Sequence, residues 1–296
     1  MVCVSFFSYK GGAGRTSLMI NTLPHLAEKL HATEKEPIIV LDLDLDSKGL
    51  SYLIEQESKF NTIQVLRGDS AIGFRQMGNI SEHPFFKELA PIGAAVGLDA
   101  ALDRSFLFVS ANSKEGAEFL SDNGNYDGSN ISLQTLRRMC RNFNCKAIVM
   151  DTPAGNQLSA ECALSISNKI VVAMRITRQF RKGTEEFLRK KSESNNSEKE
   201  YIIVPNAVPP VEGTPFSIDN IMHDISSSVC NAVGEAARVN LNLIQNGHNG
   251  INEVGLFKFR EDSLYRIAHD RELTADEKRA VESYKMLAEE IIKVNE

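Results

Sequence analysis

Short runs of consecutive apolar residues recur along the chain, and most are followed by a polar or glycine-containing turn and then by a helical pattern. Continuous runs of this length are typical of strands buried on both faces of a parallel sheet. The runs that fit this description are Val2–Phe7, Pro37–Leu41, Ser105–Ser110, Ala147–Asp151, Lys169–Met174 and Tyr201–Asn206. We predict helices at Thr16–Leu30, Leu133–Phe143, near Ile218–Val239 and at Ala275–Val294. This alternation predicts a doubly wound, mostly parallel α/β sheet flanked by helices.

The turn after the first run is rich in glycine and leads directly into the first predicted helix. It reads Lys-Gly-Gly-Ala-Gly-Arg-Thr-Ser over Lys10–Ser17. A helix entered through such a turn directs backbone N–H groups and the positive end of its dipole at one point, where a phosphate chain can bind. The pattern therefore favours a phosphate-binding loop. An ordinary strand-to-helix turn is the alternative.

Acidic residues follow two of the predicted strands. Asp42, Asp44 and Asp46 alternate after the second run, so their side chains share one face and point into the crevice above the sheet. A solvated acidic strand end is the alternative. The fourth run ends in Asp151 and continues as Thr-Pro-Ala to Gly155. An aspartate there can hold Mg²⁺ through its water, and the glycine lets a backbone N–H approach a γ-phosphate.

These motifs resemble those of the ParA/MinD family, P-loop ATPases of the SIMIBI class that act in partitioning and positioning. Lys10–Thr16 resembles the family's deviant Walker A loop, Lys-Gly-Gly-x-Gly-Lys-Thr, with Arg15 in place of the second lysine. Asp151–Gly155 matches the segment Asp-Thr-Pro-x-Gly, and Asp44–Gly49 resembles Asp-x-Asp-Pro-Gln-Gly. Phe257–Ala268 resembles the Ile-Pro-x-Asp loop and the helix after it, without the proline. The motifs occur in the family's order and cover most of the chain, which implies a P-loop NTPase fold.

The resemblance also implies roles for individual residues. The phosphates of ATP would be bound by Gly11, Gly12, Ala13, Gly14, Arg15, Thr16 and Ser17. Lys10 would reach the phosphates of a partner protomer, Asp46 would position the attacking water, and Asn206 would lie at the adenine edge. Asn206 has an alternative role as a turn residue after a strand. Mg²⁺ would be held by Thr16, Asp46 and Asp151.

The function that the resemblance implies is an ATP-dependent molecular switch. Two protomers close around two nucleotides with Mg²⁺, slow hydrolysis opens the dimer, and a protein partner reads each state. Two other functions remain open. The first is a nucleotide-binding scaffold that hydrolyses nothing, because Arg15 replaces the loop lysine. The second is a kinase or ligase built on the same P-loop scaffold.

Composition narrows the class of protein further. The 296 residues, 42% hydrophobic and 24% charged, are those of an ordinary globular protein, and we predict one domain over 1–296 with an insertion at 208–253. The five cysteines are scattered, as expected of reduced thiols. No apolar run reaches membrane-spanning length and the first strand begins at once, so we predict a cytoplasmic protein that does not bind membranes.

One stretch is basic although the net charge of −6 excludes a wholly basic nucleic-acid binder. Its cationic residues are Arg175, Arg178, Arg181, Lys182, Arg189, Lys190 and Lys191. Several relatives in the family bind DNA through basic surfaces, so we predict weak binding to DNA without sequence preference. A solvated helix face, diluted by Glu185 and Glu186, is the alternative.

Overall fold

A computed structural model describes most of the predicted strands and helices. The described residues are 1–33, 35–54, 106–109, 111, 144–193, 199–206, 218–233, 242–243, 257–260, 263–266 and 275–293. The predicted helix at Leu133–Phe143 lies outside them, as does most of the predicted insertion at 208–253.

Within the described residues, seven strands form the main sheet, in the hydrogen-bonded order β3-β2-β4-β1-β5-β6-β7. They are β1 Val2–Phe7, β2 Ile38–Asp42, β3 Phe106–Val109, β4 Ala147–Asp151, β5 Lys169–Met174, β6 Glu200–Pro205 and β7 Asn242–Leu243. β2 pairs in parallel with β3 and β4, and β6 pairs in parallel with β5 and β7. Every residue of β2, β4, β5 and β6 is buried, which is why these strands read as continuous apolar runs. The predicted parallel α/β fold is confirmed, and β7 is an addition to it.

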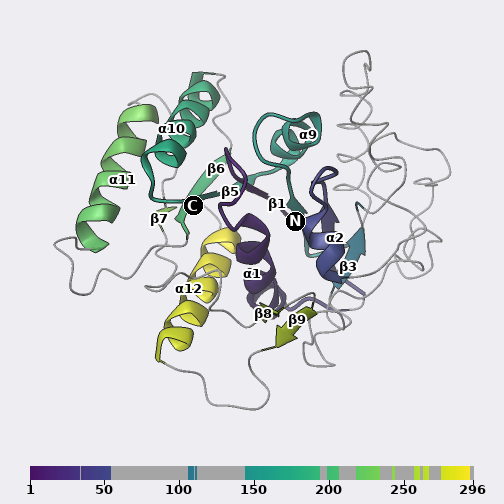
Figure 1. The fold of residues 1–296 in the computed structure, drawn as a ribbon. Coiled ribbons are helices and arrows are strands. Elements are labelled where there is room, and N and C mark those ends of the chain that lie inside the picture. Colours follow the sequence, from purple (N-terminus) through teal and green to yellow (C-terminus); the bar gives the residue numbers. More distant parts are fainter. Residues whose placement is uncertain are drawn as a thin grey trace. The chain divides into compact units, whose positions relative to one another are not determined.

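Helices alternate with most of these strands along the chain, and α12 follows the last strand (Figure 1). They are α1 Arg15–Leu30, α2 Gly49–Ile54, α9 Leu158–Ile166, α10 Arg178–Glu193, α11 Ile218–Val233 and α12 Ala275–Ile292. The sequence patterns did not predict α2 or α9, and they gave α10 only as the alternative for the basic stretch. α9 buries the small side chains of Ser159, Ala160 and Ala163, so it lacks the amphipathic pattern on which such a prediction depends. In the described parts of the chain, no helix combines the length and the apolar composition that a membrane crossing requires.

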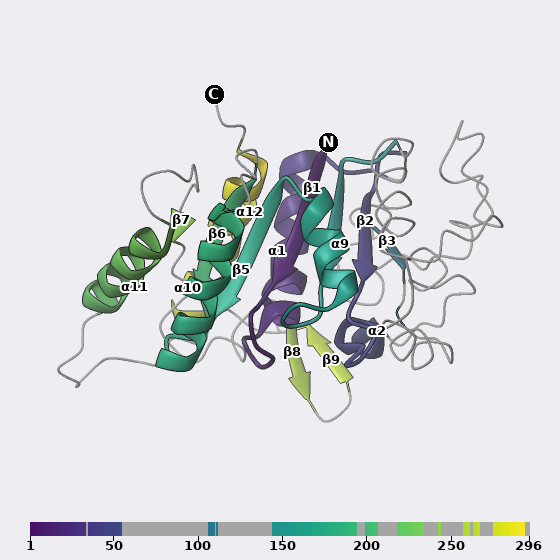
Figure 2. The ribbon, with the colours of Figure 1, turned by 90° about the horizontal axis from the view of Figure 1, so that it is seen from above.

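The chain divides into two compact units, and each is described by itself. Unit 1 comprises Met1–Ser5 and Ala27–Ser167, and unit 2 comprises Phe6–Leu26 and Asn168–Glu296. In unit 2, α10 and α11 lie side by side on one face of the β5–β6 pair, and α12 lies on the other face (Figures 1 and 2). The single domain over 1–296 stays a prediction.

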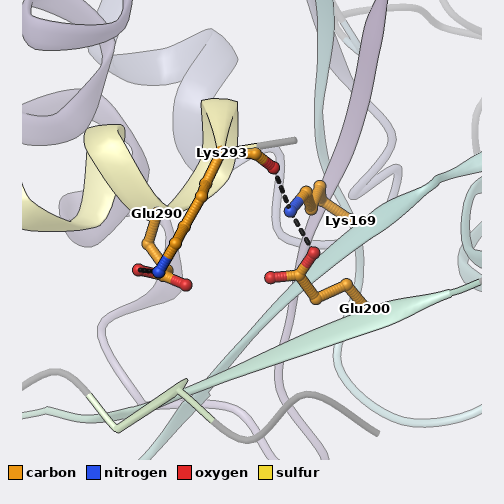
Figure 3. Close-up of polar contacts among 4 residues, drawn as sticks. All are labelled: Lys169, Glu200, Glu290 and Lys293. Carbon is orange, nitrogen blue, oxygen red and sulfur yellow. Dashed lines mark hydrogen bonds and ion pairs between the residues drawn. The ribbon is translucent and has the colours of Figure 1, made fainter. Parts of the chain in front are cut away.

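A buried ion pair in unit 2 fixes the carboxyl end of α12 (Figure 3). Lys169 and Glu200 are opposite each other at the starts of β5 and β6, and they are only 8% and 4% exposed. The Lys169 ammonium donates a hydrogen bond to a Glu200 carboxylate oxygen and another, of 2.8 Å, to the carbonyl of Lys293. The last carbonyls of a helix have no partner within the helix, so Lys169 satisfies one near the end of α12.

The segment predicted as a loop and a helix, Phe257–Ala268, is a β-hairpin where the structure describes it. β8 (Phe257–Arg260) pairs with β9 (Ser263–Arg266) in antiparallel fashion. That prediction is wrong over these residues, because apolar and basic residues alternate through β8 with the period of a strand. Ile267 and Ala268 lie outside the described residues.

Candidate nucleotide site

The glycine-rich turn of unit 2 joins β1 to the amino end of α1, as predicted. Gly12 and Gly14 have φ angles of 80° and 75°, a region that costs side-chain-bearing residues energy. A Cβ added at Gly11 or Gly12 would meet no atom within 4 Å, so the space beside both residues is open. The N–H of Leu18 donates to the Gly14 carbonyl at 2.9 Å, which begins the helical hydrogen bonding. The turn is thus an open cradle at the positive end of a helix dipole.

The side chains of this turn differ in exposure. Ala13 is buried, Thr16 and Ser17 are half-buried, and Lys10 is exposed. Arg15, the first residue of α1, is only 8% exposed. Arg15 thus brings a buried guanidinium to the start of α1, where a cation and the backbone N–H groups can bind the same anion.

The start of the turn packs along α10. The Lys10 ammonium donates a hydrogen bond of 2.8 Å to Gln179 Oε1. The Tyr9 ring occupies the space beside Gly183, where an added Cβ would lie 2.0 Å from Tyr9 Cδ1. Gly183 therefore leaves room for the Tyr9 ring, and a larger residue there would displace the ring. Phe7, before the turn, stacks on Phe187 with ring centroids 4.4 Å apart.

Two side chains from the ends of β5 and β6 contact the turn from within unit 2. Asn206 Nδ2 donates to the Ala13 carbonyl and Arg175 Nε donates to the Gly12 carbonyl, both at 2.6 Å. Asn206 is 1% exposed. The structure thus brings Asn206 to the predicted loop, although it contacts the loop itself. Its place at the adenine edge stays a prediction, and no sequence pattern predicted a role for Arg175 at the loop.

Unit 1 holds the acidic residues of the two predicted strand ends, including Asp42. Asp42 and Asp151 are opposite each other at the ends of β2 and β4, and both are fully buried. Asp42 Oδ2 accepts hydrogen bonds from the N–H of Ser51 at 2.8 Å and from its hydroxyl at 2.6 Å. Burial, and then the charge of Asp151, raise the pKa of Asp42 to about 7. Paired carboxylates of this kind attract cations and protons.

The two aspartates that follow have different surroundings. Asp44 is buried and accepts hydrogen bonds from the N–H and the hydroxyl of Ser47 at 3.0 and 2.6 Å. Asp46 is exposed. Asp42 was named among the alternating carboxylates but was given no role, because the acidic motif was placed by its spacing to Gly49. The signal that identifies Asp42 is its position as the first polar residue after the buried run.

The predicted site residues therefore fall into two groups. Lys10–Ser17 and Asn206 belong to unit 2, whereas Asp46 and Asp151 belong to unit 1. The joint magnesium site of Thr16, Asp46 and Asp151 stays a prediction. Among the described residues, no three His, Cys, Asp or Glu side chains form a ready-made metal site. A Mg²⁺ ion bound with a nucleotide takes most of its ligands from phosphates and water, so such a cluster is not required.

Comparisons with known proteins identify the fold. No protein-family model and no curated protein sequence matches the chain. The solved structure of the MinC:MinD cell division protein complex of Aquifex aeolicus matches with a TM-score of 0.57 and 16% identity over 100% of this chain and 99% of that one. The septum site-determining protein MinD of Pyrococcus horikoshii OT3, complexed with Mg-ADP, matches with a TM-score of 0.58 and 14% identity. The match covers 98% of this chain and 95% of that one.

A third match is the ATP complex of a variant of McdA from Cyanothece, with a TM-score of 0.53 and 12% identity over 83% of each chain. Together with the glycine-rich turn, these likenesses define a P-loop α/β protein. More narrowly, the chain has the fold of the ParA/MinD ATPases.

Proposed function

We propose that this protein is an ATP-dependent molecular switch. It binds Mg²⁺-ATP at the glycine-rich loop, two protomers close around two nucleotides, and slow hydrolysis reopens the dimer. The observation that carries the proposal is the cradle at the amino end of α1, where Gly12 and Gly14 take left-handed angles and the space beside Gly11 and Gly12 is open. A phosphate chain fits there because backbone N–H groups and the helix dipole favour negative charge.

The residues present fit the nucleotide and its metal ion. The backbone of Gly11–Ser17 and the guanidinium of Arg15 would bind the phosphates, and the hydroxyl of Thr16 would be a ligand for Mg²⁺. In this proposal Asp151 and Asp46 would supply carboxylates to the metal ion, and the buried Asp42 beside Asp151 is a further candidate for this role. Mg²⁺ neutralises charge on the phosphate oxygens and so favours attack by water.

The structural neighbours support the choice of ligand and of partner class. The Pyrococcus MinD structure contains Mg-ADP, the McdA structure contains ATP, and the Aquifex MinD structure contains MinC. A nucleotide with Mg²⁺ and a protein partner are therefore part of the proposal for this chain. The partner reads the dimer and is lost when hydrolysis opens it.

Nucleotide-dependent dimerisation tests the proposal. The molar mass measured by light scattering doubles when Mg²⁺ and a slowly hydrolysed ATP analogue are added, and it stays that of a monomer with Mg-ADP. A monomer under every condition would exclude the dimeric switch, and a dimer that ignores the nucleotide would exclude switching by ATP.

A nucleotide-binding protein without hydrolysis is the second candidate, and Arg15 is the observation that favours it. The guanidinium is a wide planar group at the position where the related loop has a compact ammonium, so it binds phosphate but aligns the γ-phosphate differently. Single-turnover hydrolysis of radiolabelled ATP, with protein in excess, separates the two candidates. Release of phosphate supports the switch, and its absence supports the passive binder.

We also propose that the dimer binds DNA weakly through α10. Arg178, Lys182 and Arg189 are exposed on this helix, and phosphate binding by such cations releases counterions. Glu186 opposes this attraction locally, but it is paired with Lys190 at 2.8 Å.

A further inference from the structure

Two side chains hold two consecutive carbonyl groups of the glycine-rich loop. Arg175 comes directly after β5, and its Nε donates a hydrogen bond of 2.6 Å to the carbonyl of Gly12. Asn206 comes directly after β6, and its Nδ2 donates a hydrogen bond of 2.6 Å to the carbonyl of Ala13. Since β5 and β6 pair in parallel along their full length, both side chains follow the same end of the two strands.

The backbone of Asn206 is fixed as well. Its N–H donates a hydrogen bond of 2.7 Å to the carbonyl of Met174, the last residue of β5. Met174 directly precedes Arg175, so the two residues that hold the loop are joined to each other through the backbone. Their side chains therefore act on the loop from a common rigid base at the end of the sheet.

The direction of the two carbonyls determines where the loop's N–H groups point. In a trans peptide unit the C=O and the N–H point to opposite sides. The Gly12 carbonyl shares its peptide unit with the N–H of Ala13, and the Ala13 carbonyl shares its unit with the N–H of Gly14. Hydrogen bonds from Arg175 and Asn206 therefore turn both N–H groups away from these two side chains. A carbonyl facing a phosphate would repel it, whereas an N–H attracts it.

The burial of Asn206 argues against direct contact with a base. The residue is 1% exposed, and its amide nitrogen is already donated to the loop. Recognition of adenine requires polar atoms that the base can reach, and at 1% exposure the second N–H and the Oδ1 of this amide are out of reach of a base. Arg175 differs because it also brings charge to the loop: beyond Nε, its planar guanidinium carries N–H groups on two further nitrogens.

We propose that Arg175 and Asn206 form a clamp on the Gly12–Ala13 segment that aims the loop's N–H groups at the phosphates. Both are positioning residues for the phosphate chain, and neither reads the base. This inference rests on the proposed function, since the loop must bind a nucleotide for the clamp to matter. It replaces the adenine-edge role that the family resemblance implies for Asn206.

Binding of ligands that share a triphosphate but differ in the base tests the clamp. ATP, GTP and tripolyphosphate are titrated, each with Mg²⁺, into the wild type and the Asn206→Ala, Asn206→Asp and Arg175→Met variants. Asn206→Ala and Arg175→Met weaken the binding of all three ligands by the same factor, about tenfold, as expected for one lost hydrogen bond of this kind. Asn206→Asp weakens binding more, because its carboxylate faces the Ala13 carbonyl.

Conservative variants separate positioning from a general loss of structure. Arg175→Lys restores part of the affinity that Arg175→Met loses, because the ammonium can still donate to the Gly12 carbonyl. Lys29→Ala, which removes a positive charge at the other end of α1, leaves all three affinities unchanged. The melting temperature of the ligand-free Arg175 variants stays at the wild-type value. If Asn206→Ala does not fold, the Arg175 series decides the question.

Three results would overturn the inference. Loss of ATP binding alone in Asn206→Ala, with GTP and tripolyphosphate unaffected, would make Asn206 a base reader. Unchanged affinities in the folded Arg175→Met variant would mean that the clamp does not aim the loop. A wild-type protein that binds none of the three ligands would overturn the proposed function and the clamp together, and the wild-type titration alone identifies that case.

Discussion

The ammonium of Lys10 lies 2.8 Å from Gln179 Oε1, and this hydrogen bond joins the glycine-rich loop to the first turn of α10 in the same chain. Lys10 is the residue that the family resemblance assigns to the phosphates of a partner protomer. It therefore has to leave Gln179 before it can take that role. Because the contact is exposed to solvent, its loss costs little, and binding to a phosphate can replace it.

Variants at these two positions should act in opposite directions on dimerisation. Lys10→Ala abolishes the doubling of molar mass with Mg²⁺ and an ATP analogue, because the charge that crosses to the partner is gone. Gln179→Ala lowers the analogue concentration needed for the doubling, because Lys10 is released from its own helix. Light scattering over a nucleotide titration measures both. A Lys10→Ala protein that dimerises normally would rule out the trans role of Lys10.

Substitutions of Arg15 should change binding and hydrolysis differently. Arg15→Ala weakens ATP binding by about ten- to one-hundredfold, since a hydrogen bond to a charged group contributes about 1.5–3 kcal/mol. Arg15→Lys binds ATP at least as well as the wild type and hydrolyses it faster, because the compact ammonium suits the related loop. Calorimetric titration and single-turnover assays measure the two effects, with Lys29→Ala as the control. Wild-type affinity in Arg15→Ala would show that Arg15 does not contact the phosphates.

Stability should depend on pH through Asp42. Its pKa in the folded protein is about 7, above the ordinary 3.8, because of burial and the charge of Asp151. The folded state therefore binds this proton more tightly than the unfolded state. The resulting stabilisation is complete below about pH 4 and is lost as the pH rises through about 7. Chemical denaturation without metal or nucleotide, between pH 4 and 8.5, measures the free energy of unfolding.

The variants Asp42→Asn and Asp151→Asn isolate this contribution. Asp42→Asn lacks the titrating group, so its free energy of unfolding falls less steeply with pH than that of the wild type over this range. Asp151→Asn lowers the pKa of Asp42 because the neighbouring charge is gone, although burial still raises it. Identical pH profiles for the wild type and Asp42→Asn would contradict the prediction.

Removing one member of the buried pair at the end of α12 should destabilise the fold strongly. Lys169→Met leaves the Glu200 carboxylate buried without its cation and the Lys293 carbonyl without its donor (Figure 3). We expect a loss of about 3–5 kcal/mol in the free energy of unfolding. The double variant Lys169→Met/Glu200→Met loses less than the two single variants together, since no buried charge remains.

A surface pair on α10 provides the matched control. Lys190 and Glu186 form an exposed ion pair one helical turn apart, at 2.8 Å. Lys190→Ala leaves the free energy of unfolding unchanged within error, because water replaces the partner. For the buried pair, the loss in the free energy of unfolding of Lys169→Met/Glu200→Met could instead equal the sum of the losses of the two single variants. That result would show that the charges of Lys169 and Glu200 do not stabilise each other.

DNA binding should require both the nucleotide and the basic face of α10. Fluorescence anisotropy with a labelled random duplex rises at low salt when Mg²⁺ and an ATP analogue are present, and it falls as salt is added. Replacing Arg178, Arg181 and Lys182 by alanine removes the rise, whereas Lys29→Ala does not. Binding that survives the triple substitution, or no binding with or without nucleotide, would assign this surface to a protein partner.

The sequence by itself determined strands β1 to β6, the helices α1, α11 and α12, and the glycine-rich loop. A strand buried on both faces must be continuously apolar, and a helix with one buried face must repeat its apolar residues every three to four positions. The runs at Val2–Phe7 and Lys169–Met174 therefore coincide with β1 and β5 residue by residue. The loop could also be predicted from the sequence, because the positive φ angles at Gly12 and Gly14 cost glycine little energy and cost other residues more.

Only the tertiary structure decided which side chains meet. Asp42 lies beside Asp151 because β2 and β4 are neighbours in the sheet, and no local pattern encodes the order of strands. The same holds for Asn206, whose amide is bound to a loop nearly two hundred positions earlier in the chain. The hairpin at Phe257–Arg266 replaced a predicted loop and helix for a related reason: pairing between two short segments overrode a likeness of motif. The pattern of apolar residues along the chain reflects which residues are buried. Contacts between distant residues depend on how elements far apart in the sequence pack together.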